Sequence, residues 1–492
     1  MIGRRIFYVS LVVLFIVSFH NLAAQETPLK TPEETLSVTK HSIQIDGKTL
    51  NYTATAGTIL LKEDNGKPLA SFFFIAYTKD DVKDKSRRPL LFSFNGGPGT
   101  ASVWLHLGAL GPRRVLYDDE GFALQPPYRL VDNEYSVLDV TDIVFIDPVA
   151  TGYSRMVPGE DPHKYHGVME DIESVGEFIR LYVTRNKRWE SPKFVIGESY
   201  GTTRASGLAG HLRDRHLMYL NGVMLISTTS LGVETGEDLG DALIIPHYAA
   251  TAWYHKKLPP DLQSKKLRDV LDEVEKFALG EYTLALVKGN RLSADEKREI
   301  VRKLSRYTGL SADYIEKSNL RIDRDRFRKE LLRDENRTVG RLDSRYKGID
   351  KDSVGERYEY DPAMVDWEGA FPATFNHYIR TELKYETDLS YEVWGNVRPW
   401  KRDRYVSVGE MLRRAMTENK YLKVFIAEGY YDAACDYFTA QYVFSHLDLN
   451  GELKDRITFG YYESGHMMYI RKASLAKLKN DLAEFMQSAL PE

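Results

Sequence analysis

Cysteine is almost absent from this sequence: one residue, Cys435, among 492. A single cysteine cannot form a disulfide within the chain, and a zinc site built on paired cysteines is excluded in the same way. A chain of this length buries about three quarters of the surface that its unfolded state exposes. We therefore expect a hydrophobic core, without disulfides or metals, to hold the fold.

An excess of charge of either sign is also lacking. The 67 Lys and Arg residues face 71 Asp and Glu residues, for a formal net charge of −4 at pH 7. Dedicated nucleic-acid-binding proteins concentrate positive charge, so we expect no nucleic-acid partner. The 43% of hydrophobic residues, with 31 Tyr and 21 Phe, exclude a disordered or collagen-like polymer.

A long apolar run occurs only at the N-terminus. Arg4 and Arg5 precede the apolar residues 6–19, and small residues suited to signal cleavage follow at 21–24. This run is shorter than the roughly 20 residues that span a bilayer. We predict that residues 1–24 are a signal peptide and that the protein is exported, periplasmic or secreted, with no stable membrane insertion after cleavage. An uncleaved signal anchor is the alternative.

Short apolar runs recur along the rest of the chain, each followed by a loop rich in Gly, Pro or Asp. The runs lie at residues 89–94, 142–146, 193–196, 222–226, 422–427 and 456–461. Continuous apolar runs are typical of parallel strands that are covered on both faces. Helical periodicity between the runs, as over residues 167–186, predicts an α/β fold with a doubly wound, mostly parallel sheet.

This alternation of strands and helices is interrupted between about residues 230 and 400. Residues 261–350 contain 22 Lys or Arg and 18 Asp or Glu, and apolar residues still recur there at helical spacing. The near balance of charge is typical of a solvated helical surface. We predict a core made of residues 25–230 and 401–492, with a helical cap inserted over residues 231–400.

The pentapeptide Gly197-Glu198-Ser199-Tyr200-Gly201 matches the pattern Gly-x-Ser-x-Gly. It follows the apolar run 193–196 and precedes a helical pattern, which is the strand–turn–helix context in which this motif presents a serine nucleophile. The glycines are needed because side chains there would collide with neighbouring backbone. An ordinary serine in a turn is the alternative.

A serine nucleophile needs a base to take its proton and an acid to orient that base. In this type of fold the order along the chain is Ser, then Asp or Glu, then His, on loops after later strands. Asp432 follows the run 422–427, and His466 follows the run 456–461. We predict a triad of Ser199, His466 and Asp432; the alternative for Asp432 is a helix N-cap. Two close histidine pairs lack a third ligand, so we predict no metal site.

A glycine-rich loop, Asn95-Gly96-Gly97-Pro98-Gly99, follows the run 89–94. Glycines allow backbone N–H groups to approach a ligand closely. In α/β-hydrolases the loop at this place gives one donor to the oxyanion hole, and the residue after the nucleophile gives the other. We predict that Gly97 and Tyr200 supply these donors. No lysine follows the loop as in a phosphate-binding loop.

Five motifs therefore occur in one order along the chain. They are Asn95-Gly96-Gly97-Pro98-Gly99, residues 147–154 (DPVATGYS), Gly197-Glu198-Ser199-Tyr200-Gly201, Asp432-x-x-Cys435 and Gly465-His466-Met467. Together they resemble the serine carboxypeptidases, peptidase family S10, from about Phe72 to the C-terminus.

The resemblance implies an α/β-hydrolase fold that acts on peptides without a cofactor. It implies that Ser199 attacks the peptide, that His466 acts as base and then acid, and that Asp432 holds the imidazole. It also implies that Asn95, Gly96 and Glu198 bind the terminal carboxylate of the substrate, and that Cys435 is a buried thiol beside the site. Esterase or acyltransferase activity is the alternative, followed by a non-catalytic binding protein; the sequence predicts no particular oligomeric state.

One position departs from the family in a way that matters for pH dependence. Ala109 stands where the family carries a second glutamate, which shares a proton with the one before the nucleophile. A glutamate that faces a carboxylate repels it unless one of the two holds a proton. We expect activity closer to neutral pH here than in relatives with both glutamates. A pH–rate profile unchanged by Ala109→Glu would count against this.

Overall fold

The computed structural model describes residues 32–401, 406–449 and 451–491. The predicted signal peptide, residues 1–24, lies outside this part of the chain. Within the described ranges, no helix has both the length and the apolar character needed to cross a membrane.

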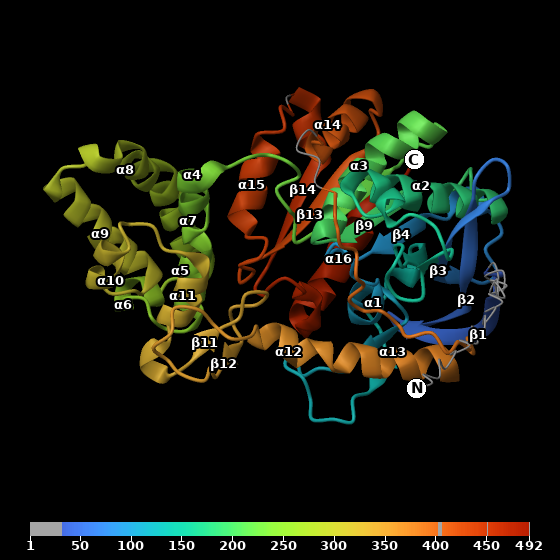
Figure 1. Ribbon diagram of the computed structural model, residues 1–492, viewed down its shortest axis with the longest axis horizontal. Coiled ribbons are helices and arrows are strands. Elements are labelled where there is room, and N and C mark those ends of the chain that lie inside the picture. Colours follow the sequence, from blue (N-terminus) through green and yellow to red (C-terminus); the bar gives the residue numbers. More distant parts are fainter. Residues whose placement is uncertain (1–31, 402–405, 450, 492) are drawn as a thin grey trace, which may run out of the picture.

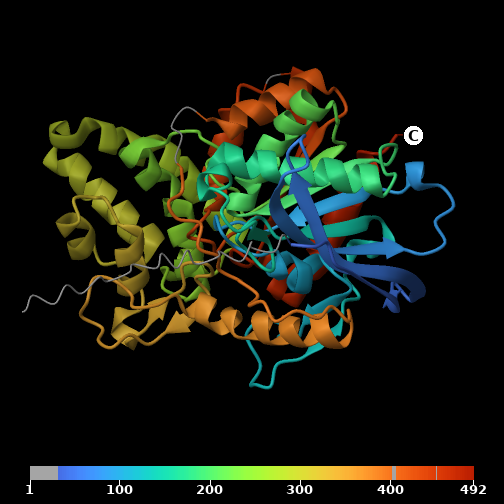
Figure 2. The same ribbon diagram turned by 45° about the vertical axis from the view of Figure 1, so that its right-hand side comes forward.

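A mixed sheet runs through the centre of the molecule (Figures 1 and 2). In spatial order its strands are β1 (Leu36–Ile45), β2 (Lys48–Lys62), β3 (Pro68–Lys79), β7 (Asp142–Ile146), β4 (Leu90–Phe94), β9 (Lys193–Glu198), β10 (Gly222–Ile226), β13 (Lys423–Gly429) and β14 (Ile457–Tyr462). The strands from β7 to β14 are parallel to one another, whereas β1, β2 and β3 are antiparallel. All six predicted apolar runs are therefore strands of one sheet.

Both faces of this sheet are covered, which explains why the parallel strands are apolar at every position. In β4, Leu90 and Phe92 face one hydrophobic core, and Leu91 faces the other. The first core contains the helices α2 (Val168–Arg185), α3 (Tyr200–His216) and α14 (Val408–Glu418). The second contains α1 (Val103–Leu105), α13 (Ala370–Thr381) and α16 (Lys472–Ser488). The predicted doubly wound α/β fold is confirmed.

Eight helices between β10 and the later strands form a separate layer around a third hydrophobic core, at the left in Figure 1. They are α4 (Gly236–Leu243), α5 (Ile245–Tyr254), α6 (Pro260–Gln263), α7 (Leu267–Phe277), α8 (Thr283–Lys288), α9 (Ala294–Thr308), α10 (Ala312–Lys317) and α11 (Arg324–Glu330). Val270 and Val274 of α7 are fully buried, as their helical spacing predicts.

The chain then returns from these helices to the sheet. A small hairpin, β11 (Thr338–Val339) and β12 (Lys347–Gly348), is followed by α12 (Pro362–Glu368) and α13, which run along the lower edge of the molecule in Figure 1. Phe371 and Phe375 of α13 are buried in the same core as Trp104. The end of this long insertion thus packs on the sheet layer, and its hairpin lies beside the loops that follow β13 and β14.

The remaining elements are short. They are β5 (Arg113–Val115), which pairs with β6 (Leu130–Asp132), β8 (Arg155–Met156), which pairs with β3, and the helix α15 (Tyr437–Ser445) after β13.

Candidate active site

Ser199 lies at a sharp turn between a buried strand and a helix. β9 ends at Glu198, α3 begins at Tyr200, and Ser199 between them has φ 58° and ψ −126°. Residues other than glycine rarely adopt a positive φ, and such strain is typical of functional turns. A Cβ atom at position 197 would lie 2.0 Å from the Gly201 carbonyl oxygen, so only glycine fits there. The turn therefore has the geometry that presents a nucleophilic serine.

His466 and Asp432 form a buried pair. His466 Nδ1 and Asp432 Oδ2 are 2.6 Å apart, and Asp432 is fully buried. The other oxygen of Asp432 accepts hydrogen bonds from the N–H groups of Ala434 (2.8 Å) and Cys435 (3.1 Å). The next helix, α15, is capped by Asp436, so the alternative of Asp432 as a helix N-cap is wrong.

The electrostatic surroundings of His466 favour its protonated form. Burial alone lowers the pKa of His466, but the charge of Asp432 and its hydrogen bond more than offset that effect, and the pKa is raised above 6.5. Because Nδ1 is turned to the carboxylate, Nε2 is the nitrogen available to a reacting hydroxyl group.

A cavity of about 160 Å³ brings most of the predicted site residues together. Its walls contain six of the eight: Asn95, Gly96, Gly97, Glu198, Ser199 and His466. Asp432 is buried behind His466. The remaining wall residues were not predicted; they are Thr100, Trp104, Arg341, Leu342, Met364, Trp394 and Met467. A larger cavity of about 410 Å³ near Asp142 contains none of the predicted residues.

The glycine-rich loop packs directly against the turn of Ser199. A Cβ atom at Gly96 would lie 2.5 Å from the backbone nitrogen of Tyr200 and 2.6 Å from the carbonyl oxygen of Glu198. Gly97 has φ 103°, which favours glycine. The N–H of Tyr200 is the first of α3, and the first N–H groups of a helix have no partner within the helix and attract negative charge.

A buried ion pair locks this loop to α3. Arg204 of α3 pairs with Asp171 of α2 at 2.8 Å and donates to the carbonyl oxygen of Asn95 at 2.7 Å. The hydroxyl group of Tyr200 donates to the same Asp171 carboxylate at 3.0 Å. Both charged side chains are almost completely buried, so the pair fixes the relative position of the loop and the turn.

Glu198 is a buried carboxyl group with an elevated pKa. Burial raises its pKa to about 7, although the positive charge of His466 and a hydrogen bond from Tyr469 act in the opposite direction. The Tyr469 hydroxyl donates to Glu198 Oε2 at 2.5 Å. Ala109 is itself buried in the second core. The partner of Glu198 is thus a tyrosine, which no sequence pattern had indicated.

Asn95 offers an unused hydrogen-bond donor beside Glu198. Its side-chain oxygen accepts from the N–H of Leu105 at 3.1 Å, which fixes the amide. Its amide nitrogen is buried next to Glu198 and Tyr469, and among the described residues it forms no hydrogen bond of normal length and angle. A buried donor without a partner costs free energy, so this group suits a ligand acceptor.

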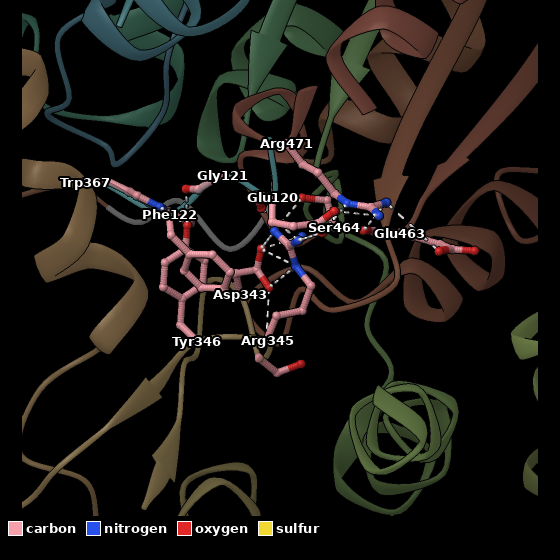
Figure 3. Close-up of polar contacts among 12 residues, drawn as sticks. Glu120, Gly121, Phe122, Asp343, Arg345, Tyr346, Trp367, Glu463, Ser464 and Arg471 are labelled. Atoms are coloured by element: carbon pink, nitrogen blue, oxygen red, sulfur yellow. Dashed lines mark hydrogen bonds and ion pairs between the residues drawn. The ribbon is translucent and has the colours of Figure 1, made fainter. Parts of the chain in front are cut away.

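A strap, defined here as residues 341–346, crosses the loop of His466. The N–H of His466 donates to the Leu342 carbonyl oxygen at 2.6 Å, and the N–H of Gly465 donates to Asp343 at 2.9 Å. Figure 3 shows Arg345 between Asp343 and Ser464; it pairs with Asp343 at 2.6 Å and donates to the Ser464 hydroxyl oxygen at 3.1 Å. The strap thus holds the histidine loop in place.

The strap also contacts a third segment of the chain, the loop that contains Glu120. Arg345 donates to the Glu120 carbonyl oxygen at 3.1 Å, and Arg471 pairs with the Glu120 carboxylate at 2.9 Å (Figure 3). Asp343 and Arg345 are at most 1% exposed in their side chains. The expectation of a solvated charged surface over residues 261–350 is therefore wrong for this pair.

Cys435 lies beside the histidine–aspartate pair. Its sulfur and the ligand atoms of Asp432 and His466 all lie within 4.8 Å of one another. The residue as a whole is partly buried, and its thiol lies beside the site, as the resemblance implies. Its surroundings raise the pKa of the thiol well above the ordinary value, through burial first and then through Asp432. The neutral thiol is therefore the form present near neutral pH.

Comparisons with known proteins identify the family of this chain. The family model of the serine carboxypeptidases matches residues 46–479. "Serine carboxypeptidase-like 36" of Arabidopsis thaliana is 28% identical over 189 residues, which cover 37% of this chain and 36% of that protein. "Pheromone-processing carboxypeptidase KEX1" of Saccharomyces cerevisiae is 31% identical over 156 residues, 30% of this chain and 20% of that protein. These alignments span about a third or less of the curated relatives.

A solved structure matches over a greater length. The crystal structure of KEX1, a prohormone-processing carboxypeptidase of Saccharomyces cerevisiae, superposes with a TM-score of 0.53 at 15% identity. The match covers 88% of this chain and 91% of that one. The likeness shows the α/β-hydrolase fold.

Proposed function

Since the chain belongs to the serine carboxypeptidase family, we propose that it removes single residues from the C-termini of peptides through an acyl-enzyme on Ser199. The observation that carries this proposal is one cavity in which a serine on a strained turn, a histidine paired with a buried aspartate, and a protonatable Glu198 meet.

The proposed chemistry follows the roles of the three residues. Ser199 Oγ attacks the carbonyl carbon of the last peptide bond, and His466 Nε2 takes the hydroxyl proton. His466 then gives this proton to the departing amino group, and the acyl-enzyme forms. Water, activated by the same imidazole, releases the shortened peptide. Asp432 holds the imidazole through Nδ1 and stabilises its charged form.

The oxyanion that forms in each step needs nearby donors. We assign this role to the backbone N–H groups of Gly97 and Tyr200, because the glycine loop packs on the turn of Ser199. The loss of one such donor typically costs about 10²–10³ in kcat.

Recognition of the free C-terminus is assigned to Asn95, Gly96 and Glu198. The unpartnered amide nitrogen of Asn95 can donate to one carboxylate oxygen. Glu198 can donate to the other only while it is protonated, which its pKa of about 7 permits up to neutral pH. The enzyme therefore distinguishes a carboxylate from a peptide bond or an amide at this position.

Peptide release tests this proposal. N-blocked dipeptides and their C-terminal amides are incubated with the wild type, with Ser199→Ala and with a matched control, Ser230→Ala, whose serine is exposed. We expect release of the last residue from the free acid by the wild type and the control, little release from the amide, and none by Ser199→Ala. Ester turnover without peptide cleavage would favour the esterase or acyltransferase alternative, and no turnover at all would favour a binding protein.

Export is a further part of the proposal, supported by the N-terminal sequence alone. Residues 1–24 combine two arginines, an apolar run and small residues before Gln25. N-terminal sequencing of protein from fractionated cells should find a chain that begins near residue 25 outside the cytoplasm. Full-length protein in the cytoplasm would contradict export.

A further inference from the structure

Arg341 lies in the wall of the active-site cavity, at the start of the strap, and the roles above leave it unused. It lines the cavity together with Ser199 and His466, and it is partly exposed. In the described part of the chain, its guanidinium group makes no hydrogen bond or ion pair. By contrast, the arginines at 345 and 204 are both paired with carboxylates.

The backbone of Arg341 is fixed relative to the catalytic residues. Its N–H donates to Asp361 Oδ1 at 3.1 Å, and its carbonyl oxygen accepts from the N–H of Ala433, next to Asp432, at 3.0 Å. The following residue, Leu342, binds the His466 N–H. The buried Asp343–Arg345 pair in Figure 3 anchors the rest of the strap. The side chain of Arg341 is therefore presented from a rigid support, which lowers the entropic cost of binding a ligand.

Arg341 lines the cavity from the strap, whereas the residues assigned to the terminal carboxylate line it from the glycine-rich loop and the end of β9. The positive charge of Arg341 acts on His466 and on Cys435. The carboxyl group of Glu198 has Asn95 and Tyr469 as polar neighbours. Arg341 is therefore a cationic group of the cavity in addition to the donors assigned to the terminal carboxylate.

We propose that Arg341 is a substrate-binding residue that recognises an acidic side chain, Asp or Glu, on one of the two residues that flank the cleaved bond. A guanidinium group matches a carboxylate with two parallel hydrogen bonds, and an arginine without a partner in a partly buried cavity gains most from an anionic ligand. Met364 and Trp394 in the same walls suit the aliphatic part of such a side chain. This proposal rests on the proposed carboxypeptidase function.

Matched substrates test the assignment. The wild type, Arg341→Met, Arg341→Lys and a control, Arg337→Met, are assayed on two pairs of blocked dipeptides: Glu against Gln as the last residue, and Glu against Gln as the penultimate one. Arg337 donates to its neighbour, the Asn336 carbonyl oxygen, and does not line the cavity. We expect the wild type and the control to prefer Glu by about tenfold or more in kcat/KM in one pair, which identifies the position.

Arg341→Met should abolish this preference while it leaves kcat/KM for the Gln substrates within about threefold, and Arg341→Lys should keep part of it. A Glu-to-Gln ratio that Arg341→Met leaves unchanged would overturn the assignment. So would an equal loss on every free-acid substrate, because Arg341 would then bind the terminal carboxylate. Absence of release from all substrates by the wild type would instead refute the proposed function itself.

Discussion

Replacement of Glu198 by glutamine tests the link between burial and pH dependence at this site. Glu198 is 4% exposed, and its carboxyl group accepts a hydrogen bond from the Tyr469 hydroxyl group. Glutamine has nearly the same shape and can accept the same hydrogen bond, but it carries no titratable proton. Any property of the wild type that depends on the ionisation of Glu198 should therefore vanish in the variant.

The effect on stability follows from the two pKa values. The carboxyl group has a pKa of 4.5 when unfolded and about 7 when folded. Between pH 4.5 and about 7 the unfolded chain releases this proton, whereas the folded protein keeps it. The free energy of unfolding therefore falls as the pH rises through this range, and the fall is complete above about pH 7. At about 1.4 kcal/mol for each pH unit, the loss is about 3 kcal/mol. Glu198→Gln should not show this loss.

Activity should report the same ionisation. When Glu198 is ionised it repels the terminal carboxylate of the substrate, so kcat/KM of the wild type should fall about tenfold for each pH unit above about 7. His466 must be neutral to act as a base, and its raised pKa limits activity on the acid side. For the wild type we expect a bell-shaped dependence of kcat/KM on pH, with a maximum near neutral pH. In Glu198→Gln the decline on the alkaline side should be absent.

Two measurements on one set of proteins test whether the ionisation of Glu198 controls both stability and activity. Urea unfolding and peptide hydrolysis are followed from pH 4.5 to 8.5 for the wild type, Glu198→Gln and Glu234→Gln, in which an exposed glutamate is replaced. The difference in unfolding free energy between Glu198→Gln and the wild type should grow by about 3 kcal/mol over this range. The reasoning is refuted if this difference stays constant and the alkaline decline persists in the variant.

Three other predictions follow. Tyr469→Phe removes a hydrogen bond that favours the ionised form of Glu198, so the alkaline decline in kcat/KM should move to higher pH; a decline at lower pH would contradict the assigned role. Asp343→Ala leaves Arg345 buried without its partner, and urea unfolding should show a loss of about 3–5 kcal/mol, partly recovered by the additional change Arg345→Met; a loss below about 1 kcal/mol would show that the strap does not depend on this pair. Cys435→Ser should keep peptide release but lose inhibition by mercurials, whereas equal inhibition of variant and wild type would place the sensitive group elsewhere.

The sheet and the reacting residues were accessible to sequence analysis for physical reasons. Strands covered on both faces must be apolar at every position, so the six runs were visible. The residues at 199, 432 and 466 each follow one of these runs, and a serine at a strand-to-helix turn needs glycines that a pattern can identify. Local sequence therefore specified these positions.

The residues that hold the catalytic loops in place could not be predicted from sequence patterns. The strap meets the histidine loop more than 100 residues away in sequence, and its charged pair resembles the surface charges around it. Arg341 and Tyr469 acquire their roles only through contacts with distant segments. Burial and pairing between such segments depend on tertiary packing, which no local periodicity encodes.

Covalent labelling of the nucleophile tests the central claim most directly. A fluorophosphonate is incubated with the wild type and with Ser199→Ala, intact mass and labelled peptides are measured, and residual peptide release is followed in parallel. We predict one adduct for each wild-type chain, located on Ser199, with release lost in proportion to labelling, and no adduct on the variant. Inactivation with the adduct on another residue, or peptide release by Ser199→Ala, would contradict an acyl-enzyme on this serine.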